Sequence, residues 1–204
     1  MEAKTLSSAI KKIAVAYIFI YLHINIGPID ILPNWAGYIM IITALPILAQ
    51  KVNSSILLKP FGIILCIYSG VNFLTNIVGI NYGIFVHIVS VLLGIISIYF
   101  HFQLITNIAE ITFEEARKKR LLFLRTAGVI IDTITMLISC LPMLLDEEIY
   151  TYISLLLIIP GCVIYFWIAG ELFGLSKTLN AEEIENCENT DSIENAEESG
   201  INEQ

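Results

Sequence analysis

The sequence feature that most limits the fold is a long stretch without any charge. No Lys, Arg, Asp or Glu lies between Lys59 and Glu110, which leaves 50 uncharged residues in a row. A membrane-spanning helix needs about 20 predominantly apolar residues, so the stretch has room for two such helices. It predicts a polytopic membrane protein built as an all-α helix bundle.

The composition agrees with a membrane protein and places the negative charge at one end. The 204 residues are 56% hydrophobic and only 15% charged, whereas a soluble domain is about a quarter charged. From Asn180 onward there are nine acidic residues and no basic one, and the rest of the chain has 11 basic and 10 acidic residues. The nearly neutral body gives no sign of nucleic-acid binding, and the segment 180–204 is expected to be a disordered acidic cytoplasmic tail.

Apolar runs separated by turn-forming residues predict six transmembrane helices within residues 1–179. The first apolar run leads directly into a second one without a small-residue cleavage site, so it is interpreted as an uncleaved first helix and not as a signal peptide. The predicted helices cover residues 9–26, 31–49, 60–80, 83–105, 113–145 and 150–175.

The basic residues indicate the orientation of these helices. Membrane proteins keep an excess of Lys and Arg on the cytoplasmic side. With six helices and a cytoplasmic N-terminus, all 11 basic residues fall in cytoplasmic segments or at cytoplasmic helix ends. Both termini are therefore predicted to be cytoplasmic.

Residues 23–38 gather prolines, glycines, a charge and aromatic side chains, and they predict a tight outer turn between the first two helices. Asp30 is well placed as the N-cap of the second helix, with Pro33 in its first turn, where the missing N–H costs little. Trp35 and Tyr38 are expected at the membrane interface. The outer-turn motif consists of Asp30, Pro33, Asn34, Trp35, Gly37 and Tyr38.

The run Ile-Asp-Ile-Leu-Pro-Asn-Trp-Ala-Gly-Tyr at residues 29–38 resembles a motif of one group of multi-pass membrane proteins from Gram-positive bacteria. In that group the motif is Ile-Asp-Ile-Leu-Pro, then Asp or Asn, an aromatic residue, any residue, Gly and Tyr. The resemblance implies a bacterial plasma-membrane protein, and it implies no biochemical activity.

The segment before the fifth predicted helix carries a basic cluster. Residues 112–115 (Thr-Phe-Glu-Glu) fit a capping box, and Glu114 and Glu115 precede Lys118 and Lys119 by four residues, the favourable order for helical ion pairs. The cluster is expected to lie at anionic lipid headgroups, either as a topology anchor or as a lipid-binding site. It consists of Arg117, Lys118, Lys119 and Arg120.

Polar residues recur at helical spacing in three of the predicted spans. Steps of three and four residues place each set on one helical face. Such stripes are typical of packing seams between membrane helices, and they can also line a polar path. The candidates for a substrate or ion path are Asp132, Asn72, Asn76, Ser90, Ser97 and Arg125.

Asp132 is the main functional candidate, because it lies near the middle of the fifth predicted span. A charged carboxylate there costs at least about 2.5–3.5 kcal/mol on insertion scales. Such residues face the bundle interior or a wet cavity and often mark ion or substrate paths. Asn72 and the segment 90–97 are expected beside it. A protonated Asp132 bonded to Asn72 would be a purely structural alternative.

Signatures of enzymes and of metal sites are missing from the sequence. His87 and His101 are about 21 Å apart along one predicted helix, and His23, His87 and Asp30 would provide three ligands at best. There is no serine-hydrolase elbow, zinc-protease motif or Walker loop. The sequence predicts neither an enzyme nor a bound metal or cofactor.

Two functions remain open from the sequence. The first is non-enzymatic binding or translocation of a small solute or ion through a polar bundle interior, with Asp132 at its centre. The second is an interaction, accessory or immunity-type membrane component that acts through its cytoplasmic loop and acidic tail. The lipid bilayer is the one partner that the sequence indicates directly.

Overall fold

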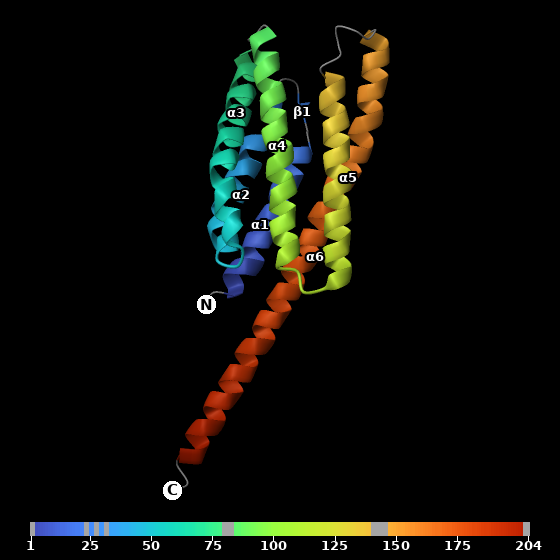
Figure 1. The fold of residues 1–204 in the computed structure, drawn as a ribbon. Coiled ribbons are helices and arrows are strands. Elements are labelled where there is room, and N and C mark those ends of the chain that lie inside the picture. Colours follow the sequence, from blue (N-terminus) through green and yellow to red (C-terminus); the bar gives the residue numbers. More distant parts are fainter. Residues whose placement is uncertain are drawn as a thin grey trace.

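The computed structural model describes residues 3–22, 25–26, 29–30, 33–78, 84–139 and 147–201. These residues are almost entirely helical (Figure 1), which confirms the predicted all-α class. The helices are α1 (Ala3–Tyr21), α2 (Asn34–Ala49), the short 3-10 helix η1 (Asn53–Leu58), α3 (Lys59–Val78), α4 (Ile84–Glu110), α5 (Glu115–Ser139) and α6 (Glu147–Ile201).

A very short hairpin joins α1 to α2. Strand β1 (Asn25–Ile26) pairs antiparallel with strand β2 (Ile29–Asp30). The chain therefore reverses within a few residues, as expected for a tight turn between two helices. The predicted first helix ran to residue 26, whereas α1 ends at Tyr21 because the chain enters this hairpin.

The start of α2 differs from the prediction. Asp30 belongs to β2 and α2 begins at Asn34, so the prediction that Asp30 caps the second helix is wrong. Pro33 occupies the N-cap position in an extended conformation (φ −69°, ψ 129°) and makes no side-chain cap. Because proline fixes its own φ near this value, it starts the helix without the help of an acidic cap.

The start of α5 also differs from the prediction. The hydroxyl of Thr112 donates to the carbonyl oxygen of Ile108 at the end of α4 (2.9 Å), and α5 begins at Glu115. The predicted capping box at residues 112–115 is therefore wrong, because the threonine is bonded to the preceding helix. The predicted end of this helix, at residue 145, lies outside the described residues.

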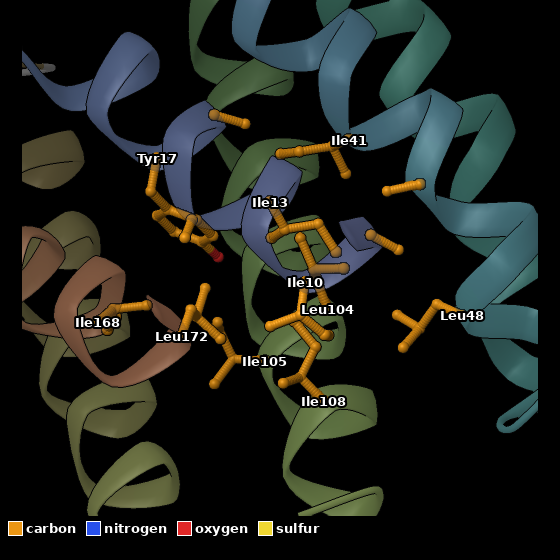
Figure 2. Close-up of a cluster of buried hydrophobic side chains, with 14 of the residues drawn as sticks. Ile10, Ile13, Tyr17, Ile41, Leu48, Leu104, Ile105, Ile108, Ile168 and Leu172 are labelled. Carbon is orange, nitrogen blue, oxygen red and sulfur yellow. The ribbon is translucent and has the colours of Figure 1, made fainter. Parts of the chain in front are cut away.

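α1 is the central helix of the bundle. It packs against α2 and α6, and its buried side chains join those of α2, α4 and α6 in one apolar core (Figure 2). Ala9, Ala14 and Ala16 are fully buried, which allows the neighbouring backbones to approach closely. The labelled core residues are Ile10, Ile13 and Tyr17 from α1, Ile41 and Leu48 from α2, Leu104, Ile105 and Ile108 from α4, and Ile168 and Leu172 from α6.

The outward faces of the helices are apolar. Ile67, Leu74, Phe123 and Leu156 are each more than 60% exposed. A surface of this kind is suited to lipid and not to water. Among the described residues, four helical stretches are long and apolar enough to cross a membrane, and α2 is apolar but shorter. The chain is therefore a helical membrane protein. The four stretches are Asn53–Val78, Ile88–Glu110, Glu115–Ile138 and Tyr152–Ala181.

α6 continues as a helix well beyond the bundle (Figure 1). The sequence predicted a helix ending near residue 175 and a disordered segment 180–204, and the structure differs by extending the helix to Ile201. No proline follows Pro160, and Ala and Glu are good helix formers. The part of α6 inside the bundle supplies the helical nucleus, so adding further turns is easy.

Gly37 marks a close approach of α2 to α1. A Cβ atom at this position would lie 2.7 Å from Cγ1 of Ile20 and 2.8 Å from the carbonyl oxygen of Ala16. The second of these atoms belongs to the backbone of α1, so it cannot move aside unless the helix shifts. Only glycine fits this contact.

We expect Gly37→Ala to lower the free energy of unfolding by about 1–3 kcal/mol, the usual cost of overpacking a core. Gly170→Ala is the matched control, because a Cβ atom there meets nothing within 4 Å. In a helix Ala is favoured over Gly by about 1 kcal/mol, so the control is expected to keep or raise stability. Unfolding of the purified protein in detergent measures both, and equal stability of Gly37→Ala and wild type would contradict the close contact.

Candidate functional site

A cavity of about 390 Å³ lies between α2, α3 and α4. We call it the polar cavity. Amide and hydroxyl groups from all three helices reach it, and none of the described residues that line it is charged. The lining residues are Pro33, Asn34 and Tyr38 at the start of α2, Leu65, Tyr68, Ser69, Asn72, Phe73 and Asn76 from α3, and Ser90, Leu93, Gly94 and Ser97 from α4.

Hydrogen bonds connect the walls of the polar cavity. The hydroxyl oxygens of Tyr68 and Ser90 are 2.6 Å apart and link α3 to α4. The side chains of Tyr38 from α2 and Ser97 from α4 both line the cavity. Within the part of the chain that the structure describes, no hydrogen bond involves the side-chain amides of Asn72 and Asn76. These amides therefore keep their donors and acceptors for a bound molecule.

Four of the six predicted path residues come together in the polar cavity, namely Asn72, Asn76, Ser90 and Ser97. The other two, Asp132 and Arg125, line a different cavity. The expectation that Asn72 lies beside Asp132 is therefore wrong. The reason is that α4 packs against both α3 and α5, so the polar residues of α3 and α5 face separate spaces.

The outer-turn motif contributes to the polar cavity and to the core. Pro33, Asn34 and Tyr38 line the cavity, and the ring of Trp35 makes an edge contact with Phe73. Tyr38 is only 7% exposed, so its side chain lies inside the bundle. Because Gly37 has no side chain, α2 approaches α1 closely enough to bury Tyr38.

A second and much smaller cavity, of about 10 Å³, lies between α1, α4, α5 and α6. We call it the Asp132 cavity. The hydroxyl of Tyr165 donates a hydrogen bond to Oδ2 of Asp132, and the hydroxyl of Tyr17 lies 3.2 Å from Nδ1 of His101. The lining residues are Tyr17, Ile98, His101, Phe102, Ile105, Arg125, Val129, Asp132, Tyr165 and Ile168.

Arg125 is held by α4. Its guanidinium donates to the hydroxyl of Thr106 (2.9 Å) and lies 4.1 Å from the ring centroid of Phe102. A cation above an aromatic ring is attracted by the ring's negative face. The hydrogen bond found for the Asp132 carboxylate comes from Tyr165 and not from this arginine.

Two members of the predicted lipid anchor are bound by a carboxylate of α6. Arg120 donates to Glu171 through Nε (2.8 Å) and through a terminal nitrogen (3.3 Å). Nε of Arg117 lies 3.6 Å from the same carboxylate. Glu171 therefore fastens the first turns of α5 to α6, and these two arginines are less available to lipid than the sequence suggested.

The ion pairs at the start of α5 are shifted by one residue from those predicted. Glu114 pairs with Arg117 (3.3 Å) and Glu115 with Lys118 (3.8 Å), three residues apart in each case. The predicted pairs with Lys118 and Lys119 were four residues apart.

Sequence reasoning missed the residues that surround Asp132. Tyr17 and Tyr21 come from α1 and Tyr165 from α6, and the rings of Tyr21 and Tyr165 are stacked with centroids 3.4 Å apart. The one signal in the sequence was the spacing of four residues between the two tyrosines of α1, which places them on one helical face. Nothing in the sequence indicated that Tyr165 faces the same interior.

Comparison with protein families, with curated proteins and with solved structures finds no match to this chain.

We expect Glu171→Gln to destabilise the protein more than Glu115→Gln does, because it removes a two-point, charge-assisted contact between α5 and α6. Glu115→Gln is the matched control. The side chain of Glu115 is 73% exposed, and exposed pairs contribute about 0–1 kcal/mol. Denaturant unfolding in detergent compares the two variants, and equal effects would argue against the contact between the helices.

Proposed function

We propose that this protein is a non-enzymatic, multi-pass protein of the bacterial plasma membrane that binds a small, uncharged polar solute in the polar cavity. Binding would serve the recognition or the passage of that solute. The observation that carries the proposal is a cavity of about 390 Å³ lined by amides and hydroxyls and by no charged side chain among its described residues.

The size and lining of the polar cavity support a small-molecule ligand. Ligand pockets commonly measure about 300–1,000 Å³. The amides of Asn72 and Asn76 can each donate and accept hydrogen bonds, as polyols, amides and similar solutes require. A charged solute would enter without a counter-charge, which is costly in a membrane interior.

We further propose six spans with both termini in the cytoplasm. Four helical stretches are long and apolar enough to span a membrane, and α1 and α2 add a hairpin that packs against them. This orientation keeps every basic residue at the cytoplasmic side. The polar cavity then lies in the outer half of the membrane, because it is formed where α2 begins and where α3 ends.

A panel of uncharged polyols, small amides and nucleosides tests the proposal through thermal stabilisation of the protein in detergent. At about 100 times its Kd, a ligand stabilises the folded state by about 2.7 kcal/mol. We expect at least one panel member to stabilise wild type and to lose this effect in Asn72→Leu. Charged analogues of the same size are expected to have no effect.

Thr75→Val is the matched control for Asn72→Leu. Thr75 lies on the same helix, outside the residues that line the polar cavity, and its hydroxyl bonds to the carbonyl oxygen of Asn72 within α3. Stabilisation that survives in Thr75→Val and disappears in Asn72→Leu would support binding in the cavity. Stabilisation that is unchanged in Asn72→Leu, or absent for the whole panel, would contradict it.

A second function is favoured by the extension of α6. This helix continues past the bundle to Ile201, and its sequence from Asn180 onward is acidic. We propose as the alternative that this segment docks a basic protein partner and that the protein is an accessory or immunity-type component.

Truncation after Leu179 separates the two functions. If the acidic segment docks a partner, a second protein is expected to co-purify in stoichiometric amount with the full chain. The same protein is expected to co-purify with Asp132→Asn and to be missing from the truncated chain. If the polar cavity carries the function, the truncated chain keeps its thermal stabilisation by the solute. Co-purification that is independent of residues 180–204 would exclude the docking role.

A further inference from the structure

The interior of the bundle holds buried nitrogen atoms without a hydrogen-bond partner. Nε2 of His101 and Nε of Arg125 are both shielded from solvent, and neither bonds to any residue that the structure describes. His101 is only 5% exposed. Both side chains line the Asp132 cavity. An unsatisfied buried polar atom costs about 1–3 kcal/mol, so such atoms call for a bound water or ligand.

Hydroxyl groups complete the polar lining of the Asp132 cavity. Tyr165 donates to the Asp132 carboxylate, and Tyr17 bonds to the imidazole of His101. The rings of these two tyrosines stack with centroids 6.1 Å apart. A carboxylate and an imidazole, the two side chains most able to exchange a proton near neutral pH, therefore share one small space with two hydroxyls.

The size of the Asp132 cavity decides what it can hold. Its volume is about 10 Å³, and a single water molecule needs about 10–15 Å³ and two to four polar partners. An organic solute is far too large. The carboxylate, the imidazole and the guanidinium are the available partners for the water.

We propose that the Asp132 cavity is a proton-binding site, in which one water molecule meets the unpaired Nε2 of His101 and Asp132 takes up and releases a single proton. On uptake, a protonated water gives its proton to the free Oδ1 of Asp132. One O–H bond of the donor breaks, one O–H bond forms on the carboxylate, and neutral water remains. The charge of Asp132 changes from −1 to 0, and nothing is oxidised or reduced.

The groups around Asp132 accommodate both of its states. They are Tyr17 and Tyr21 from α1, Tyr38 from α2, His101 from α4, Arg125 from α5 and Tyr165 from α6. The hydrogen bond from Tyr165 reaches Oδ2 and leaves Oδ1 open to accept a proton. Arg125 is engaged by Thr106 and Phe102, so a basic side chain does not lock the carboxylate in its charged form.

This inference goes beyond solute binding and does not rest on it. None of the described residues that line the Asp132 cavity also lines the polar cavity. A failure to find a solute for the polar cavity therefore does not count against the proton site. A failure to find the proton site likewise does not count against solute binding.

Infrared difference spectroscopy of the full chain in lipid nanodiscs tests the proposal with the proton itself as the ligand. Spectra are recorded while the pH is changed from alkaline to acidic. We expect a carbonyl band of a protonated, buried carboxylic acid to appear in wild type and to be absent in Asp132→Asn. Tyr165→Phe is expected to keep the band and to shift it to higher frequency, because the acid loses its hydrogen bond.

Tyr152→Phe is the matched control for Tyr165→Phe. Tyr152 lies on the same helix and is 72% exposed, so its loss is expected to leave the band in place. His101→Gln is expected to change the pH at which the band appears, since it alters the partner of the water. A band that persists in Asp132→Asn, or one that Tyr165→Phe and Tyr152→Phe affect equally, would overturn the proposal. If Asp132→Asn fails to fold, the two tyrosine variants still decide it.

Discussion

The close contact between α1 and α2 at Gly37 is the constraint on which the rest of the structure depends. Because no side chain intervenes, the backbone of α2 comes against Ala16 and Ile20 of α1. Tyr38, the next residue, is then buried with its ring 6.1 Å from His101. A hydrophobic contact between two short helices thus brings the start of α2 into the centre of the bundle and shapes the wall of the polar cavity.

The position of α4 explains why the bundle contains two separate polar sites. One part of its surface supplies Ser90 and Ser97 to the polar cavity, and another supplies His101 to the Asp132 cavity. The first space is large and uncharged, and the second is water-sized and holds a carboxylate. Membrane interiors penalise unpaired charge, so separating the carboxylate from the larger space lets each site keep its own chemistry.

The sequence predicted much of the fold and part of the candidate sites. The helical class, the tight turn before α2, the shared face of Asn72 and Asn76 on α3 and that of Ser90 and Ser97 on α4 all follow from local patterns. Hydropathy and helical period are properties of neighbouring residues. The acidic segment at the end of α6 shows the limit of composition. The high negative charge of residues 180–204 predicted a disordered segment, whereas the structure continues α6 to Ile201.

The sequence by itself determined that the chain is a helical membrane protein, because a stretch of 50 residues without a charge is long enough for two membrane-spanning helices. It also determined that Asp132 is costly to bury. Only the tertiary structure decided which residues surround that carboxylate. Tyr165 is 33 residues away from it, and the choice between Tyr165 and Asn72 depends on the order in which helices pack. Packing order depends on contacts such as the one at Gly37, which join distant segments and leave no periodic signal in the sequence.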